Sequence, residues 1–227
     1  RDLVRSRGLG DVYKRQHLDI YENPALAVEE RVSALLSQMT LEEKVGQMLT
    51  SLGWPMYERQ GNTIRLTEQL VREIEEYHTG SLWGFMRADP WTQRTLTTGL
   101  TPALAAKASN MLQKYAIEHG RLGIPLFLAE ECPHGHMAIG TTVFPTSIGQ
   151  ASTWNPELIR RMGSAIANEA SAQGAHIGYG PVLDLARDSR WSRVEETYGE
   201  DPVLSATIGA AMVKGMGAGN LSEPHHV

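Results

Sequence analysis

The sequence lacks three features that would each mark a class of protein. No stretch approaches the roughly 18 to 20 continuous apolar residues that a membrane-spanning helix requires, so we expect no membrane partner. Cys132 is the only cysteine, which leaves no pair for an internal disulfide. Lysine and arginine number 21 against 26 aspartates and glutamates, and the net charge of -5 argues against a nucleic-acid partner. Nothing in the sequence pattern indicates an oligomeric state.

Signals for nucleotides and metals are missing as well. No glycine-rich phosphate loop follows a predicted strand, which argues against a nucleotide-binding α/β protein. His134 and His136 are separated by one residue, whereas a helical metal site places two imidazoles four residues apart. We therefore expect no metal and no cofactor.

What is present begins with an unusual first segment. Residues 1–16, "RDLVRSRGLGDVYKRQ", hold 5 of the 21 lysines and arginines and contain neither an apolar block nor a helical stripe. We expect this segment to be a non-native or disordered tail. Residues 17–227 are then expected to form one domain.

From His17 onward, helix and strand signals alternate along the chain. Thr40 and Glu43 match a capping box, and Asn155 and Asp201 each precede a proline at a predicted helix start. Helices are predicted over residues 25–39, 40–49, 67–80, 101–120, 155–174 and 201–219, and strands over 81–85, 124–130 and 175–185. Buried strands that alternate with helices predict an α/β fold with a parallel sheet.

The strand count suggests an incomplete barrel. Three or four strands can be defended, whereas a closed (β/α)8 barrel has eight. The chain ends at "LSEPHHV" without completing another element. We therefore expect the N-terminal portion of a TIM-like barrel, a partial (β/α)8 fold cut before its end.

Charged side chains follow the second and third predicted strands, where the active sites of such folds form. The first of these loops carries Glu130, Glu131, His134 and His136. Four interpretations compete for it: a metal site and a nucleophilic Cys132, both of which the spacing disfavours, and a sugar-binding cluster and histidines with a purely structural role, which both remain open.

The second loop, residues 186–201, carries the stretch "RWSRVEETYGED". An ion-pair network that ties strand ends to the next helix would account for its outer charges, which are Arg187, Asp188, Glu200 and Asp201. Arg193 is predicted to face the cleft, where its guanidinium either contacts a ligand or pairs only with Glu196 or Asp184. Trp191 is either a sugar platform or a packing residue.

Four stretches together resemble glycoside hydrolase family 3, the family of β-glucosidases and β-xylosidases. They are "RVSALLSQMTLEEKVGQML" at 31–49, "IPLFLAEECPHGH" at 124–136, "TVFPTSIGQASTWNPELI" at 142–159 and "GPVLDLARDSRWSRVEETYGEDP" at 180–202. Their order and spacing are those of the family's N-terminal catalytic domain, and the resemblance extends from about His17 to Val227. It implies a barrel related to the (β/α)8 fold and retaining hydrolysis of terminal β-linked sugars.

The resemblance also assigns residues. The acidic residue three places before the histidine of the "HG" pair matches Glu131, and the last arginine of the "RWGR" motif matches Arg193. Both contact the sugar of the glycone site in the family. This sequence departs from the motif at Ser189, which stands for proline, and at Ser192, which stands for glycine.

The resemblance also implies residues that support this pair and catalytic residues that come later in the family's sequence. We expect His134, Asp184, Trp191 and Glu196 to support the two sugar-binding residues. The family's nucleophilic aspartate and its acid/base come later than Val227, so no catalytic residue is expected within this chain.

The sequence thus predicts part of a retaining, exo-acting β-glycosidase that acts on an oligosaccharide or β-glycoside. Glu131 is longer than the aspartate of many glucosidases and favours pentosides such as xylosides. A non-catalytic carbohydrate-binding barrel protein is the alternative.

Overall fold

The computed structural model describes residues 19–217 and 225–227 of the chain. The predicted tail at residues 1–16 and residues 221–224 of the closing stretch lie outside the described residues. Contacts divide the chain into two units, Arg1–Val45 and Gly46–Val227. No helix among the described residues is both long and apolar enough to cross a membrane.

The first unit is helical where it is described. It contains the short helix η1 (Ile20–Glu22) and helix α2 (Val28–Gln38), and helix α3 (Leu41–Gly46) begins in it. The Thr40 hydroxyl accepts a hydrogen bond from the Glu43 amide at 3.2 Å, and the Glu43 carboxylate accepts one from the Thr40 amide at 2.9 Å. The predicted capping box is therefore confirmed.

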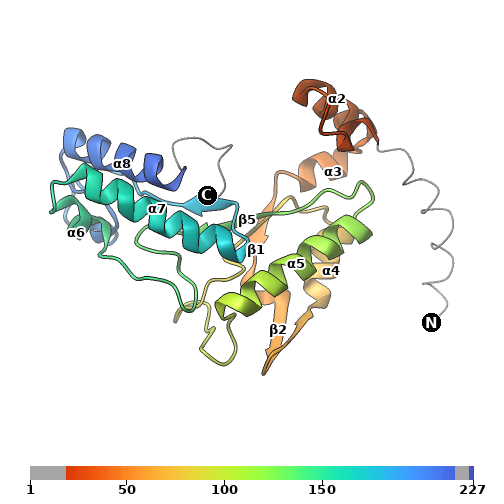
Figure 1. Ribbon diagram of the computed structural model, residues 1–227, viewed down its shortest axis with the longest axis horizontal. Helices are drawn as coiled ribbons and strands as arrows, with labels where there is room; N and C mark the ends of the chain where they lie inside the picture. The colour runs from red at the N-terminus through yellow and green to blue at the C-terminus, as the bar shows by residue number, and fades with distance from the viewer. Residues whose placement is uncertain (1–18, 218–224) are drawn as a thin grey trace. The chain divides into compact units, whose positions relative to one another are not determined.

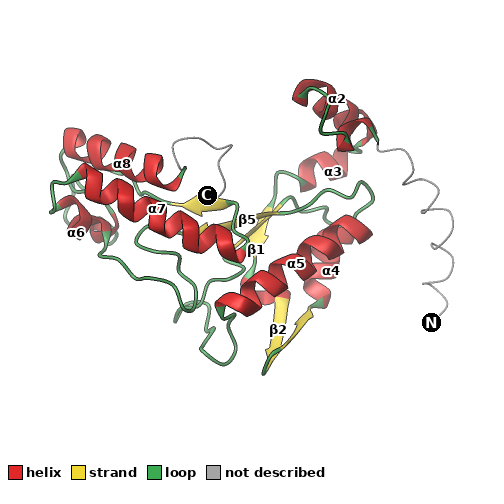
Figure 2. Cartoon of the chain, in the orientation of Figure 1, coloured by secondary structure: helices red, strands yellow, loops and turns green. Residues whose placement is uncertain are grey.

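The second unit is built on a four-stranded parallel sheet (Figure 2). Its strands lie in the order β1 (Thr50–Leu52), β4 (Ser81–Trp83), β5 (Phe127–Glu131) and β6 (Ile177–Tyr179). Helices α4 (Glu68–Glu75), α5 (Pro102–His119), α6 (Ser147–Ala151), α7 (Pro156–Gln173) and α8 (Pro202–Met216) alternate with these strands, and short helices lie at η2 (Trp54–Met56) and η3 (Val194–Glu196). The predicted α/β class and partial TIM-like barrel are confirmed.

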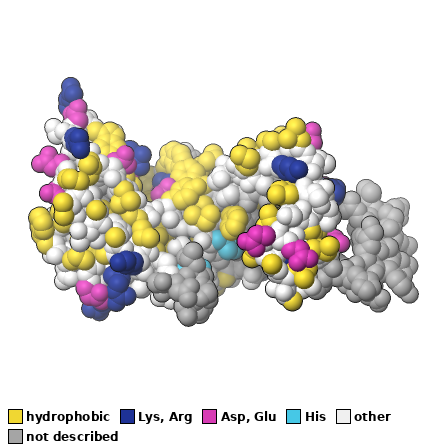
Figure 3. All heavy atoms as spheres, turned by 90° about the horizontal axis from the view of Figure 1, so that it is seen from above, with side chains coloured by type: hydrophobic (Ala, Val, Ile, Leu, Met, Phe, Trp, Pro, Cys, Tyr) yellow, Lys and Arg dark blue, Asp and Glu magenta, His cyan; other side chains and the backbone are white. Residues whose placement is uncertain are grey.

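Helices cover one face of this sheet. Helix α5 packs against α4 and α7, and α7 packs along α8 (Figure 1). The core between helices and sheet contains fully buried Leu82, Leu112, Leu128 and Ile166. The opposite face carries apolar side chains that are between 37% and 59% exposed, namely Leu52, Phe127, Ile177 and Tyr179. Hydrophobic side chains also reach the surface over α7 and α8, at the left of Figure 3.

Local signals explain the longest helices. Asn155 accepts a hydrogen bond from the Leu158 amide at the start of α7, and Gly174 ends that helix in the left-handed region with φ 106°. Helices α7 and α8 approach closely where α7 has Gly163, because this residue has no Cβ. An added Cβ would lie only 2.8 Å from the Met212 carbonyl oxygen. One predicted stop is wrong: α4 ends at Glu75, well before Gly80.

Three strands, β1, β2 and β3, were not predicted. Strand β1 is only three residues long and forms by pairing with β4. Strands β2 (Tyr57–Gln60) and β3 (Thr63–Leu66) form an antiparallel hairpin outside the main sheet. The hairpin buries Tyr57 and Ile64.

Candidate functional site

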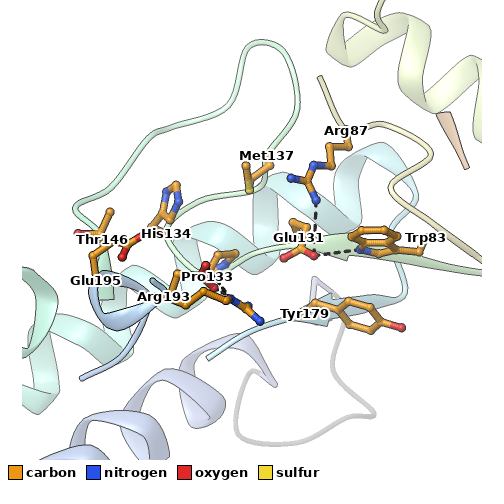
Figure 4. A pocket seen from close by; sticks show the side chains of 11 residues that line it. Trp83, Arg87, Glu131, Pro133, His134, Met137, Thr146, Tyr179, Arg193 and Glu195 are labelled. Atoms are coloured by element: carbon orange, nitrogen blue, oxygen red, sulfur yellow. Dashed lines mark hydrogen bonds and ion pairs between the residues drawn. The ribbon is translucent and has the colours of Figure 1, made fainter. Parts of the chain in front are cut away.

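A cavity of about 640 Å³ opens at the carboxyl ends of β4, β5 and β6 (Figure 4). Trp83, Glu131 and Tyr179, the last residues of these strands, all line it. Glu131 lies beside Tyr179 in the β5–β6 register, so their side chains leave the same face of the sheet. The loops after the strands supply the other lining residues, which are Arg87, Pro133, His134, Met137, Thr146, Arg193, Glu195 and Glu196.

Glu131 is held on one side of the cavity. Its Oε1 accepts a hydrogen bond from the Trp83 indole N–H at 3.0 Å and lies 3.7 Å from Nη1 of Arg87. Among the described residues no hydrogen bond reaches its Oε2. Burial raises the pKa of the Glu131 carboxyl, and the nearby Arg87 cation and the Trp83 hydrogen bond oppose this rise. One carboxylate oxygen is therefore anchored while the other remains available as an acceptor.

Arg193 also lines the cavity, at the end of the loop that leads into η3 (Figure 4). Its guanidinium donates two hydrogen bonds to Glu196, one of 2.9 Å from Nε and one of 2.6 Å from Nη2. The hydrogen bonds and charge of Arg193 hold the pKa of Glu196 below its usual value. The arginine side chain is 57% exposed, so it remains reachable from the cavity.

The loop after β5 is fixed by its backbone. The Cys132 amide donates to the Tyr179 carbonyl at 2.8 Å, and the Phe144 amide donates to the His134 carbonyl at 2.8 Å. Gly135 has φ 121°, and a Cβ there would clash with the Thr142 carbonyl oxygen. This loop places the His134 side chain at the cavity.

His136 and Cys132 belong to the interior instead. His136 is buried, neither ring nitrogen has a hydrogen-bond partner among the described residues, and burial lowers its pKa to about 4. Burial raises the pKa of the Cys132 thiol well above its usual range, with the Glu130 and Glu131 carboxylates adding to the rise. A buried thiol of high pKa is a poor nucleophile, so this geometry does not favour the cysteine hypothesis.

Glu130 precedes Glu131 on β5, is fully buried and does not line the cavity. Its Oε1 accepts a hydrogen bond from the Met86 amide at 3.0 Å, and its Oε2 has no partner among the described residues. Burial raises the pKa of this carboxyl to about 8, against the lowering effect of the backbone hydrogen bonds from residues 85 and 86. Glu130 is therefore largely protonated at neutral pH.

The structure brings together four of the six residues predicted for the site: Glu131, His134, Arg193 and Glu196. Asp184 and Trp191 are not among the residues that line the cavity. Trp191 is half-buried, and its amide donates to the Asp188 carbonyl at 3.1 Å.

The predicted ion-pair network of the outer charges takes a different form. Asp188 pairs with Arg190 at 2.6 Å on the surface. Asp201 instead accepts hydrogen bonds from the amides of Val203 and Leu204 and so begins helix α8. The expected position of Asp201 at a helix N-terminus is thus confirmed, but the contact of Asp188 lies within the loop and does not tie a strand end to the next helix.

Sequence reasoning missed Trp83 and Arg87, on and just after β4. The same rule that pointed to the loops after β5 and β6 applies here, because "GFMRADPW" places charged residues directly after a predicted strand. The sequence therefore carried a signal for Arg87.

The arrangement suits a ligand rich in hydroxyl groups. Carboxylate oxygens supply acceptors, guanidinium groups supply donors, and Trp83 and Tyr179 supply apolar surface. Within residues 19–217 and 225–227, no group of three or more His, Cys, Asp or Glu side chains is arranged to hold a metal ion.

Comparison with known proteins gives consistent matches. Residues 40–223 match the family model described as the glycosyl hydrolase family 3 N terminal domain. The chain is 34% identical over 197 residues to a putative beta-xylosidase of Formosa agariphila, covering 86% of this chain and 24% of that protein. It is 32% identical over 203 residues to a periplasmic beta-glucosidase of Salmonella typhimurium, covering 87% of this chain and 22% of that protein.

A solved structure is similar as well. It is a mutant beta-glucosidase from Listeria innocua in complex with laminaribiose, with a TM-score of 0.64 and 33% sequence identity. The match covers 83% of this chain and 24% of that one. The chain thus spans about a quarter of the length of these relatives.

Proposed function

The chain belongs to glycoside hydrolase family 3, and from this premise we propose that it is part of a retaining, exo-acting β-glycosidase. The longer protein, called the parent protein below, removes terminal non-reducing β-D-glucosyl or β-D-xylosyl residues from an oligosaccharide or β-glycoside. The names of the similar proteins, beta-xylosidase and beta-glucosidase, support this substrate class.

One observation carries the proposal: the cavity at the strand ends is lined by both a hydrogen-bond acceptor and a hydrogen-bond donor. Glu131 offers its free Oε2, and Arg193 offers a partly exposed guanidinium. A sugar ring with adjacent hydroxyl groups can donate to the first and accept from the second. We assign both residues to the glycone site, with His134 and Glu196 beside them.

We assign to Glu131 and Glu196 a role in binding and not in the reaction. Retention needs two carboxyl groups roughly 5 to 5.5 Å apart, one acting as nucleophile and the other as acid and then base. Glu196 is paired with Arg193 in two hydrogen bonds, and its lowered pKa makes it a poor proton donor. Glu131 is committed to Trp83 and Arg87 through Oε1. The nucleophilic aspartate and the acid/base are therefore assigned to later parts of the parent protein.

The glycone is proposed to be a pentose in preference to a hexose. Glu131 carries one methylene more than aspartate, which brings its free oxygen further into the cavity and leaves less room for a C6 hydroxymethyl group. Such a difference corresponds to about 1 to 3 kcal/mol of discrimination.

The test compares the parent protein with residues 17–227 alone on aryl β-glucosides, β-xylosides, β-glucosaminides and arabinosides. We expect the parent to release the phenol from at least one of them. The short chain should release none and should lack a cooperative thermal transition, because Leu52, Phe127, Ile177 and Tyr179 leave an apolar sheet face open to water.

Two outcomes would contradict this proposal. A parent that binds these sugars but cleaves none would be the non-catalytic carbohydrate-binding protein of the alternative hypothesis. Activity of the short chain above that of a Glu131→Gln, Glu196→Gln double variant would show that the reacting carboxyls lie in this cavity.

A further inference from the structure

Arg87 occupies a constrained position on the loop after β4, at the edge of the cavity. Its guanidinium carbon lies 5.4 Å from the ring centroid of Trp83 and 4.8 Å from that of Trp91. Its Nε donates to Asp89 at 2.7 Å, and its Nη1 lies 3.7 Å from Oε1 of Glu131. The side chain is only 14% exposed. Two aromatic rings and two carboxylates thus fix the direction of one cation.

The surrounding loop is itself held in place. Trp54 packs against Trp83 and Trp91 with ring centroids 5.8 and 4.8 Å apart, respectively. Asp89 and Thr92 close the turn between Arg87 and Trp91, with the Thr92 amide donating to Asp89 at 2.8 Å. Arg94 donates to the carbonyls of Trp54 and Tyr57, which connects the loop to the β2–β3 hairpin. Arg87 therefore rests on a rigid support.

We propose that Arg87 is a positioning residue for Glu131. The guanidinium, clamped by Trp83 and Trp91, keeps Oε1 of Glu131 against the wall of the cavity, so that Oε2 is presented to the ligand as an ionised acceptor. This role rests on the proposed function of the cavity as a sugar site, and it adds a residue that does not itself contact the sugar.

Electrostatics around Glu131 support this role. Four charged or titratable groups interact electrostatically with its carboxyl group: the cations Arg87 and Arg193 and the acids Glu130 and Glu196. Burial is the largest influence and raises the pKa of Glu131, while Arg87 is the strongest influence that lowers it. Loss of the Arg87 cation would therefore let the carboxyl take up a proton at a higher pH, and a neutral Glu131 is a weaker acceptor.

The experiment uses the parent protein and its best aryl β-glycoside, with kcat and KM measured from roughly pH 4 to pH 9. Arg87→Met removes the charge and keeps an unbranched apolar side chain, and Arg87→Lys restores a charge without the planar group. Arg65→Met is the matched control, because Arg65 forms only an exposed pair with Glu58 at 4.0 Å.

For Arg87→Met we expect KM to rise about tenfold or more, with a smaller change in kcat, because a charged partner of the binding group is lost. The acidic limb of the kcat/KM profile should move to higher pH by about one unit. Arg87→Lys should return the acidic limb toward the wild-type position, and Arg65→Met should match wild type throughout.

A loss of activity that is equal at every pH, together with an unmoved acidic limb, would overturn the proposal. Crystal structures of the parent and of Arg87→Met give a readout that needs no activity. The Glu131 carboxylate should leave the Trp83 indole in the variant, and an unchanged carboxylate contradicts positioning. If the wild-type parent cleaves no glycoside, the proposed function fails, and the crystal comparison still decides the role of Arg87.

Discussion

Glu130→Gln tests the electrostatics of the site without any assay of activity. Glu130 is fully buried, and burial raises the pKa of its carboxyl to about 8. Glutamine has nearly the same shape, keeps an acceptor for the Met86 amide and does not titrate. The substitution therefore removes a proton-binding group and leaves the packing in place.

The magnitude follows from linkage. Between the ordinary value of 4.5 and about 8, the folded protein holds a proton on Glu130 that the unfolded chain releases. The free energy of unfolding therefore falls as the pH rises through this window, by about 1.4 kcal/mol for each pH unit. Across the whole window this one group lowers the free energy of unfolding of the wild-type protein by roughly 5 kcal/mol. In Glu130→Gln this decrease is absent, because glutamine does not titrate.

Thermal unfolding of the parent protein at a series of pH values checks this expectation. The variant should unfold at about the same temperature as wild type near pH 4.5 and at a higher one near pH 8. At pH 8 the gap corresponds to roughly 5 kcal/mol in the free energy of unfolding, and the shift in degrees becomes smaller as the cooperative unit that contains Glu130 becomes larger. Glu118→Gln, at an exposed position paired with Lys114, should leave the pH dependence unchanged. A gap between Glu130→Gln and wild type that does not widen with pH would refute the reasoning.

Three further predictions concern two residues of the cavity and the start of helix α8. Arg193→Lys should raise KM for aryl β-glucosides and β-xylosides together, because an ammonium cannot reproduce the fork that holds Glu196, and wild-type kinetics would assign Arg193 a structural role only. Glu131→Asp should raise the ratio of glucoside to xyloside kcat/KM, by about tenfold and at most about two-hundredfold, and an unchanged ratio would contradict the steric argument. Asp201→Ala should destabilise the parent by about 1 kcal/mol in chemical denaturation, because the hydrogen bonds that begin α8 are lost. Asp188→Ala at the surface should cost less than about 0.5 kcal/mol, and equal effects of the two substitutions would count against the capping role.

The long helices could be predicted because their signals are local. Asn155 and Asp201 each accept hydrogen bonds from amides two or three residues ahead, so the residues that begin α7 and α8 are read directly from the sequence. Gly80 was misread as a helix stop for a different reason. A Cβ there would clash with the Gln47 backbone, so glycine is required at this position by a tertiary contact and not by a helix end.

The short strands could not be located in the same way. Strand β1 owes its existence to pairing with β4, and its three residues carry no pattern of their own. The β2–β3 hairpin did carry a signal, since Gly61 and Asn62 separate two runs in which Tyr57 and Ile64 point inward.

One rule located part of the site. Glu131 ends β5 and His134 follows that strand, and the edge of a parallel sheet brings such residues together. Asp184 and Trp191 follow β6 in the sequence too, yet neither lines the cavity. The same rule could have placed Arg87 near the site, but its contacts with Trp83 and Trp91 are tertiary and are not revealed by spacing along the chain.

The most direct test of the sugar site is a crystal structure of the parent protein soaked with D-xylose or D-glucose. Oε2 of Glu131 and the guanidinium of Arg193 should each lie about 2.6 to 3.2 Å from hydroxyl oxygens of one bound sugar ring, at the carboxyl ends of β4, β5 and β6. A sugar bound elsewhere, with this cavity empty at saturating concentration, would contradict the account.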